Sequence, residues 1–375
     1  MINKGNYITA DCYADHFSSS YCFFKDNKTY NGKAGEEQVR KRTRNHNLSI
    51  KGIFKLGNRH KLSVGTEYIV DVLKSQTDNI AKEDAYTLAL FAQDEIKLLR
   101  NLQALIGVRY IYHENFKNHA TPNVALMYKP GKFNFRASYA AGFRTPTLSE
   151  LYATDIAKKN DRLTIGNLDL KPEKNNYFSL SAEYVHERFS VSVNAFYNNI
   201  RDMIDYNTIA TGDKAMEQYG HKEVRQRDNI AEAKVYGINV SANAYLGAGF
   251  NLSGGYTHLN TQDVELEQPI DKSIKNAYNI NAQWAHSWKI YRLNINLNGR
   301  FNSKRFSKSY GYAPEYQLWD LNTRHSFNLK SVIIEPGCGM ENLFDYMDDR
   351  PYNSNYATLT PGRSFYISLS LKFKS

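Results

Sequence analysis

The sequence has little of what several protein classes require. It contains only three cysteines in 375 residues, which excludes a dense disulfide framework. No stretch approaches the roughly 20 consecutive apolar residues of a membrane-spanning helix, so a helical membrane protein is excluded. Aromatic residues make up 13% of the chain, and this argues against disorder. A membrane β-barrel is compatible with so polar a chain, because only half of each barrel strand faces lipid.

The first residues also lack a leader. The segment MINKGNYITADCYADHF has no basic stretch followed by an apolar run, so no signal peptide is visible. The first expected strand begins at about residue 4. The chain therefore reads as if it started inside a domain.

The chain is rich in alternation between apolar and polar residues. Leu62, Val64 and Thr66, for example, alternate with Lys61, Ser63 and Gly65. Such a period of two predicts a strand with one apolar and one polar face. Sixteen segments of this kind are expected, at 4–17, 38–56, 60–73, 85–97, 102–115, 120–129, 133–142, 176–187, 189–202, 231–247, 250–262, 276–288, 291–303, 317–329, 332–343 and 361–373.

The connections between these segments differ in length. Tight turns are expected at 57–60, 129–132, 186–188 and 247–249, and long polar connections at 18–37, 143–175, 203–230, 263–275, 304–316 and 344–360. Short turns at one end and long loops at the other are typical of outer-membrane barrels. A soluble β-sandwich is the alternative, but its strands average only about 5–6 residues. We therefore expect residues 1–375 to form one all-β domain, a transmembrane antiparallel β-barrel.

Aromatic residues gather near the expected strand ends. Amphipathic rings favour the two interfaces of a membrane with water. The residues in question are Tyr278, Trp284, Trp288, Tyr291, Tyr310, Tyr312, Tyr316 and Trp319. The final strand closes on Phe373, and outer-membrane barrels commonly end on an aromatic residue, although Lys374 and Ser375 follow it here.

Several motifs occur in a fixed order along the chain. They are YAAGFRTPTLSELY (139–152), GNLDLKPEKNNYFSLSAEY (166–184), VNAFYNNIRDMIDY (193–206), AKVYGINVSANAYL (233–246), NLSGGYTHLNT (251–261) and an ending that begins MENLFDYMDDRPY at 340. Together they resemble the C-terminal barrel of a TonB-dependent outer-membrane receptor, in the branch that contains haem, cobalamin and colicin-type iron receptors.

The resemblance implies more than the chain shows. Such receptors have a 22-stranded barrel, an N-terminal plug and a segment that contacts the TonB complex. With sixteen expected strands, about six strands and the plug are missing. We therefore expect a truncated receptor or the second half of a split one, with a separately encoded plug half as a possible partner.

Two boxes in this set carry candidate structural residues. Phe143, Arg144, Thr145 and Pro146 resemble one box of haem-type receptors, and the run from Asn167 to Leu170 resembles another. No histidine lies between the boxes, so the haem mechanism of that branch is not copied directly. Pro146 would end one strand, and Pro172 and Glu173 would begin the next, where a missing N–H costs little.

Arg144 has two possible roles. It could hold carboxylates of the adjoining loop, Glu173 among them, or it could contact the ligand. The other ligand candidates lie in loop 203–230, where we single out His221, Lys222, Arg225 and Arg227. Arginine and histidine suit anionic or iron-bearing ligands. The alternative is an ordinary solvated loop or a contact with lipopolysaccharide. His113 and His119 are further candidates.

The remaining features point to no other chemistry. The basic run Lys41-Arg42-Thr43-Arg44 has no nucleic-acid recognition module beside it, and suits phosphate-rich lipopolysaccharide or a polar lumen better. Cys12, Cys22 and Cys338 have no metal-site spacing. Cys12 and Cys22 could form a disulfide, and Cys338 falls in phase with lipid-facing residues. Searches for catalytic and phosphate-binding motifs fail, so no enzyme and no cofactor is expected.

The sequence thus predicts an outer-membrane receptor of a Gram-negative bacterium. It would take up a scarce metal chelate such as an iron–siderophore, haem or cobalamin, with energy supplied through the TonB complex by the missing N-terminal part. It would contact membrane lipid and lipopolysaccharide but no nucleic acid. The alternatives are a complete sixteen-stranded passive porin and a soluble β-rich binding protein.

Overall fold

A computed structural model describes residues 5–28, 31–157, 161–230, 232–307, 311–348 and 361–374. Most of the expected long connection at 344–360 lies outside these residues. By the density of its internal contacts the chain divides into two compact units. Unit 1 comprises Met1–Leu126, Ser138–Tyr177 and Asn199–Glu232, and unit 2 comprises Met127–Ala137, Phe178–Asn198 and Ala233–Ser375.

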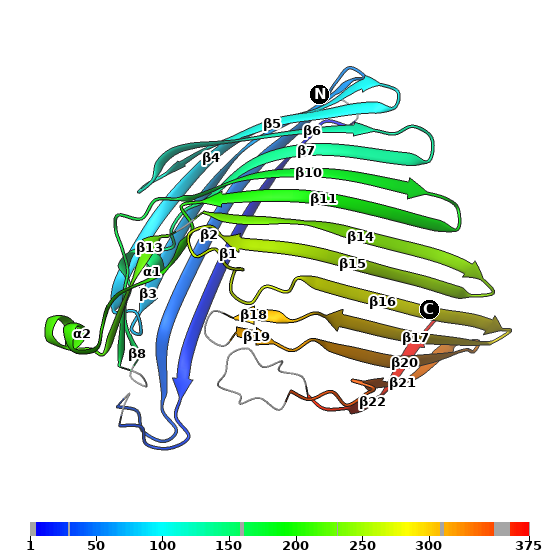
Figure 1. Ribbon diagram of the computed structural model, residues 1–375. Coiled ribbons are helices and arrows are strands. Elements are labelled where there is room, and N and C mark those ends of the chain that lie inside the picture. Colours follow the sequence, from blue (N-terminus) through cyan, green and yellow to red (C-terminus); the bar gives the residue numbers. More distant parts are fainter. Residues whose placement is uncertain are drawn as a thin grey trace. The chain divides into compact units, whose positions relative to one another are not determined.

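Sixteen long strands form one antiparallel sheet in chain order (Figure 1). Each lies on one of the sixteen segments that alternation predicted, with ends that differ by up to five residues. The strands are β1 (Tyr7–Cys22), β2 (Glu37–Leu56), β3 (His60–Ser75), β4 (Ile80–Leu99), β5 (Leu102–His113), β6 (Lys117–Tyr128), β7 (Phe133–Arg144), β10 (Glu173–Val185), β11 (Phe189–Arg201), β14 (Ala233–Gly247), β15 (Phe250–Asp263), β16 (Asn276–Trp288), β17 (Tyr291–Asn302), β20 (Tyr316–Asn328), β21 (Val332–Glu341) and β22 (Ser364–Phe373).

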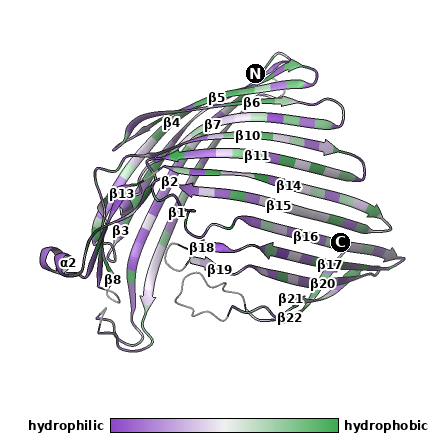
Figure 2. Cartoon of the chain, in the orientation of Figure 1, coloured by the Kyte–Doolittle hydropathy of each residue, from purple (hydrophilic) through white to green (hydrophobic). Residues whose placement is uncertain are grey.

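The two faces of the strands differ in accessibility as the alternation requires. Along β2, Arg42, Arg44, His46, Leu48 and Ile50 are exposed, whereas the residues between them are half-buried. Hydrophilic and hydrophobic residues follow one another along the strands in Figure 2. Successive side chains of a strand point to opposite faces, so each strand presents one set outward and the other inward.

The long connections contain secondary structure that the sequence analysis did not predict. Between β7 and β10 lie α1 (Leu148–Tyr152), β8 (Thr154–Ala157) and β9 (Arg162–Ile165). Between β11 and β14 lie β12 (Ile204–Thr211), α2 (Gly212–Tyr219) and β13 (Glu223–Asn229), and between β17 and β20 lie β18 (Arg305–Ser307) and β19 (Gly311–Ala313). None of the helices in the described residues is long and apolar enough to cross a membrane.

Helix α1 identifies the inward face of the neighbouring strands in unit 1. Leu148 of α1 and Ala153 pack against Leu73 of β3 and against Ile80 and Ala85 of β4, and all five are buried. The face of β3 that carries Leu73 is therefore covered by the chain itself. The alternate residues of β3, including Val72 and Lys74, face the other way.

The cysteines answer a question that the sequence left open, namely whether Cys12 and Cys22 form a disulfide. Cys12 and Cys22 are both free and exposed, and they lie ten residues apart in the single strand β1. Ten residues of extended chain span about 33 Å, whereas a disulfide needs Cα atoms within about 7 Å. Cys338 is exposed as well and lies opposite Ile367 in the β21–β22 ladder, which agrees with its expected place on the outward apolar face.

The two edges of the sheet are β1 and β22, which stand at opposite ends of the strand order. Phe373 is the last residue of β22, lies opposite Val332 and is exposed.

Candidate functional site

Two long connections in unit 1 build a second, smaller sheet. Loop 145–172 supplies β8 and β9, loop 202–232 supplies β12 and β13, and the strand order is β12-β13-β9-β8. The two loops meet where β13 runs parallel to β9, with Glu223 opposite Arg162 and Arg225 opposite Thr164. The other two pairings are antiparallel. We call this element the loop sheet; β8, β13 and α2 mark it in Figure 1.

One face of the loop sheet is a small hydrophobic core. Leu163 of β9, Ala210 of β12, Ala215 of α2 and Val224 of β13 are buried together. Val224 has no exposed surface at all, and α2 covers this side. Burial of this apolar cluster stabilises the contact between two loops that are otherwise separate, so the loop sheet holds the residues on its other face in a defined arrangement.

The opposite face of the loop sheet is polar and basic. Because side chains alternate along a strand, Arg225 and Arg227 of β13 point away from Val224. Tyr206 lies opposite Arg227 on β12, and Thr164 lies opposite Arg225 on β9. We call the residues Arg162, Arg225, Arg227 and Tyr206 the loop-sheet arginine face.

The arginines of this face are held in different ways. The Arg227 guanidinium carbon lies 3.6 Å from the centroid of the Tyr206 ring, and Arg227 Nη2 donates to the Tyr206 hydroxyl at 2.7 Å. Arg225 Nε donates to Glu223 Oε1. Arg162 Nε is buried and has no hydrogen-bond partner within the described part of the chain. A buried donor without a partner is costly.

His221 and Lys222, both ligand candidates, lie just before β13. Gly220 ends α2 in the left-handed conformation with φ 72°, which turns the chain toward His221. His221 Nδ1 lies 2.8 Å from Asp161 Oδ1, and the Lys222 N–H donates to the Asp161 carbonyl oxygen at 3.0 Å. The hydrogen bond with His221 lowers the pKa of the Asp161 carboxyl. His221 therefore joins loop 202–232 to loop 145–172, and its Nδ1 is engaged in that contact.

Arg144 joins the end of β7 to both loops. Its Nη1 donates to Glu150 Oε2 at 2.9 Å, its Nε to Glu173 Oε2 at 2.7 Å and its Nη2 to Glu173 Oε1 at 2.6 Å. Glu173 Oε1 also accepts from the Ile204 N–H at 2.8 Å. The pairing with Glu173 that the sequence allowed is thus present, together with a second carboxylate from α1.

Glu150 has a further role at the start of α1. Its Oε2 accepts from the Thr147 N–H at 2.8 Å, and the Glu150 N–H donates to Thr147 Oγ1 at 3.2 Å. These two bonds form a capping box, which satisfies backbone donors at the helix start. Burial would raise the pKa of the Glu150 carboxyl, but the bonds from Arg144 and Thr147 outweigh it and lower that pKa.

The second box serves the packing beneath the loops. Leu170 is buried in a cluster with Leu151 and Ile204. Asn167 Oδ1 accepts from the Asp169 N–H at 2.9 Å, a local turn contact. Pro146 and Pro172 are buried and lie just after β7 and just before β10, as expected for residues that end and begin these strands.

Asn229 fastens the base of loop 202–232 and was missed by the sequence analysis. Asn229 Oδ1 accepts from the Lys171 N–H at 2.7 Å, while its Nδ2 donates to the carbonyl oxygens of Lys171 at 2.9 Å and Asp202 at 2.7 Å. One side chain thus connects the starts of β10 and β12 with the end of β13.

The two other histidine candidates lie outside the loop sheet. His119 of β6 stacks on Phe143 with ring centroids 4.5 Å apart, and its Nε2 donates to the Phe116 carbonyl oxygen at 2.9 Å. His113 is buried, and its Nδ1 accepts from the Asn115 N–H at 3.1 Å. No group of three or more His, Cys, Asp or Glu side chains in the described ranges could hold a metal ion.

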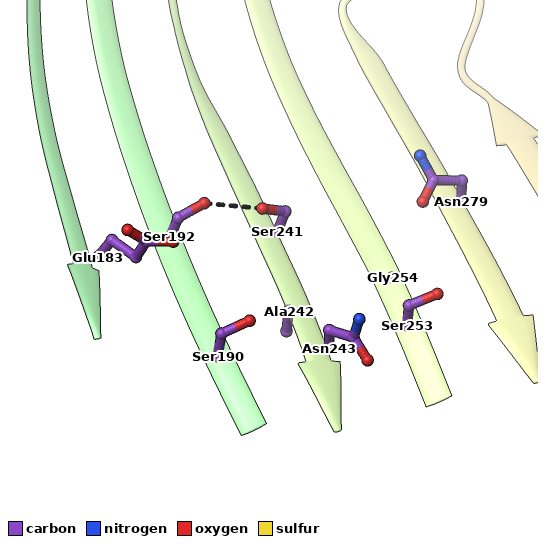
Figure 3. Close-up of a pocket in the computed structure, with 9 residues that line it drawn as sticks. All are labelled: Glu183, Ser190, Ser192, Ser241, Ala242, Asn243, Ser253, Gly254 and Asn279. Atoms are coloured by element: carbon purple, nitrogen blue, oxygen red, sulfur yellow. Dashed lines mark hydrogen bonds between the residues drawn. The ribbon is translucent and has the colours of Figure 1, made fainter. Parts of the chain in front are cut away.

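Unit 2 has a polar cavity of its own. It has a volume of about 300 Å³ and is lined by Glu183, Ser190, Ser192, Ser241, Ala242, Asn243, Ser253, Gly254 and Asn279, which come from five neighbouring strands (Figure 3). Ser192 Oγ and Ser241 Oγ are 2.7 Å apart. Hydroxyl and amide groups dominate this wall, and it carries a single carboxylate.

A sheet of sixteen long antiparallel strands, with short turns at one end and structured loops at the other, is typical of outer-membrane β-barrel proteins. The family model described as "TonB dependent receptor-like, beta-barrel" matches residues 4–343. The chain therefore belongs to the TonB-dependent receptor β-barrel family. This membership places the protein in the Gram-negative outer membrane, so the alternative of a soluble binding protein is wrong. It also places the protein among receptors rather than enzymes.

Known proteins resemble the chain in both sequence and structure. It is 24% identical over 334 residues to an iron-regulated outer membrane virulence protein of Vibrio cholerae, a match that covers 84% of this chain and 49% of that protein. The chain thus spans about half the length of the curated relatives it matches.

Two solved structures have the same fold. The ferric enterobactin receptor of Pseudomonas aeruginosa, crystallised as a mutant, aligns with a TM-score of 0.79 and 18% identity over 98% of this chain and 59% of that one. A siderophore receptor of Acinetobacter baumannii aligns with a TM-score of 0.73 and 16% identity over 98% of this chain and 63% of that one.

Proposed function

We propose that the chain is the ligand-binding barrel portion of a receptor that imports an iron–siderophore complex. The family supports a receptor. The names of the similar proteins, an iron-regulated outer membrane protein and two siderophore receptors, favour iron–siderophore over haem or cobalamin.

The observation that carries the proposal is the loop-sheet arginine face. A metal chelate whose ligand atoms are deprotonated oxygens is anionic and rich in acceptors, and planar guanidinium groups suit such surfaces. Arg225 and Arg227 are fixed on one strand, and Tyr206 adds an aromatic ring. Arg162 lies on the same face of the neighbouring strand β9, opposite Glu223. Lys222 directly precedes the first residue of β13. Arg144 holds the neighbouring loop 145–172 through its ion pairs with Glu150 and Glu173.

The proposal assigns different tasks to the ligand candidates. Arg225 and Arg227 contact the ligand, and Arg162 adds positive charge on the neighbouring strand β9. Arg144 positions loop 145–172 through Glu150 and Glu173, and His221 joins that loop to loop 202–232. Direct ligand contact by Arg144 and His221 is therefore not part of the proposal.

Import requires parts that lie beyond this chain. We propose that a plug and a TonB-contacting segment, encoded upstream or as a separate half, complete the receptor. The half-length coverage of the curated relatives supports this. The outward face of the strands would then contact lipid and lipopolysaccharide.

The experiment is a binding measurement on the protein purified from outer membranes. Ferric enterobactin is the first probe, and haem and cobalamin serve as competitors. Loss of one charge-assisted contact costs about 1.5–3 kcal/mol, so Arg225→Ala and Arg227→Ala should each raise Kd roughly 10- to 100-fold. Lys214→Ala on the exposed surface of α2 is the matched control.

The outcomes separate the possibilities. Equal affinity of both arginine variants and the control would remove the arginine face from the site. Tight binding of haem or cobalamin but not of ferric siderophores would change the ligand class. A steady open conductance of the purified chain in a planar bilayer, unaffected by the ligand, would favour the passive porin.

A further inference from the structure

The loop-sheet arginine face also carries carboxylates. Asp155 of β8 lies opposite Thr164 of β9, and Thr164 lies opposite Arg225 of β13. Residues that lie opposite each other on neighbouring strands place their side chains on the same side of the sheet. Asp155 and Arg225 therefore share one row of this face, roughly 10 Å apart at two strand spacings. Glu223, which lies opposite Arg162, is a second carboxylate on the same face.

The two carboxylates are compensated to different degrees. Glu223 Oε1 accepts from Arg225 Nε, so these two side chains form an ion pair. Asp155 is half-buried and forms no ion pair with a side chain in the described part of the chain. Asp155 is therefore the less compensated negative charge on a face that otherwise attracts anions.

The turn between β3 and β4 places another negative charge beside Asp155. The Thr154 N–H donates to the Asp78 carbonyl oxygen at 2.8 Å, so this turn contacts the start of β8. The Asp78 carboxylate pairs with Lys41, with Oδ2 and Nζ 3.5 Å apart. Burial raises the pKa of the Asp155 carboxyl, and repulsion from Asp78 raises it further, against the attraction of Arg162. Together these surroundings favour the protonated form of Asp155.

An anionic ligand on the arginines would act on Asp155 in the same direction. A ferric tris-catecholate, for example, is a trivalent anion. At roughly 10 Å in water, a trivalent anion raises the pKa of a carboxyl by about one unit. Uptake of a proton by Asp155 then removes the repulsion between its carboxylate and the ligand. Proton and ligand therefore favour each other's binding by the same factor.

We propose that Asp155 couples anion binding at the loop-sheet arginine face to the uptake of a proton, so that the protein holds its ligand more tightly in acid. This coupling rests on the proposed function, because it concerns the same arginine face. Affinity rises as the pH falls from the pKa that Asp155 has in the complex to its lower pKa in the free protein, and it is level on either side of this window.

Calorimetric titration of the purified protein in buffers of different ionisation enthalpy counts the protons that bind with the ligand. Ferric enterobactin and naphthalenetrisulfonate are the probes. The trisulfonate is a trivalent anion without iron, and its sulfonates stay ionised at every pH used. With a shift of about one pKa unit, we expect uptake of about half a proton at the middle of the window and a roughly tenfold lower Kd in acid than at neutral pH.

Substitution of Asp155 identifies the group that takes up the proton. Asp155→Asn removes the charge and keeps the shape of the side chain, so at neutral pH this variant should bind the trisulfonate about as tightly as the unaltered protein binds it in acid. His221 and Glu223 also titrate near the face, but they are present in both proteins and their contribution cancels in the comparison. Asp213→Asn is the matched control and should keep the full pH dependence, because Asp213 is exposed on α2, on the opposite side of the loop sheet.

The outcomes separate this coupling from the proposed function. Trisulfonate binding without proton uptake, or equal uptake by Asp155→Asn and the unaltered protein, would refute the role of Asp155. Coupled binding of the trisulfonate by a protein that does not bind ferric enterobactin would overturn siderophore import and leave the coupling intact, and failure of both anions to bind would overturn both. If Asp155→Asn does not fold, Asp78→Asn tests the same point. Loss of the repelling neighbour should move the window to lower pH, and an unmoved window would refute the proposal.

Discussion

Replacing Arg144 with alanine tests the anchor that holds the two loops. The change removes the hydrogen bonds to Glu150 and Glu173, whose side chains are only 12% and 16% exposed, whereas that of Arg144 is 42% exposed. Exposed ion pairs contribute about 0–1 kcal/mol, and breaking a buried pair costs about 3–5 kcal/mol. Two nearly buried carboxylates with a half-exposed arginine fall between these limits. We therefore expect Arg144→Ala to destabilise the folded arrangement of the two loops by about 2 kcal/mol.

Hydrogen–deuterium exchange measures this cost locally. The N–H groups of Leu151, Gly166 and Asn167 are hydrogen-bonded within loop 145–172, and a cost of about 2 kcal/mol should speed their exchange about 30-fold. Arg144→Lys keeps the charge but loses the fork of donors and should give a smaller effect. Arg136→Ala, at an exposed position of the same strand, should give none.

The reasoning would be refuted by unchanged exchange of loop 145–172 in Arg144→Ala. The anchor would then contribute nothing beyond the apolar packing beneath the loops. A rise in exchange throughout the strands would point instead to a general loss of folding. The Arg136→Ala control shows whether any arginine-to-alanine change on this strand has that general effect.

Three further predictions concern the same loops. Asn229→Ala loses three hydrogen bonds, two of them to Lys171. Each bond contributes about 1 kcal/mol to the stability of the folded loop, so limited proteolysis of loop 202–232 should become at least tenfold faster. Gly166→Ala would place a Cβ 2.5 Å from the Leu151 carbonyl oxygen, and this overpacking should cost about 1–3 kcal/mol, seen as faster exchange in α1 but not in β12. The lowered pKa of Glu150 stabilises the closed loop above its ordinary pKa of about 4.3, and this contribution is lost as pH falls through the lowered value. Pepsin cleavage in loop 145–172, corrected for the activity of the protease, should therefore rise below about pH 4, and a flat profile would contradict the assignment.

The strands could be predicted because their signal is local. Each long strand carries its own alternation over ten or more residues, so all sixteen were found without knowledge of their neighbours. The ends were less sharp, as at β4, which begins at Ile80 rather than at residue 85. The capping residues Thr147 and Glu150 have the spacing typical of a helix start, and that signal could have revealed α1.

The loop sheet could not be predicted because its pairings are distant and its strands short. β9 has only four residues, and its parallel partner β13 lies about 60 residues further along the chain. The residues of the candidate site likewise divide into those placed by local periodicity and those placed by distant pairing. Arg225 and Arg227 are two residues apart and share a face by periodicity alone, whereas Tyr206 and Arg162 join them only through cross-strand register.

The expected roles of the other candidates depended on partners that no motif marks. His221 was considered for its chemistry, but its contact with Asp161 makes it a connection between loops. Arg144 was expected to have either of two roles, and its two carboxylate partners match the positioning role.

The parallel pairing of β9 with β13 has a consequence for exchanging loops between receptors. Replacing loop 202–232 alone removes the strand that covers β9 and takes away Val224 and Ala215, against which Leu163 packs. A two-stranded remnant with an uncovered leucine would be left behind. The two loops can therefore be transplanted only together as one unit, and sequence changes in either loop are constrained by the other.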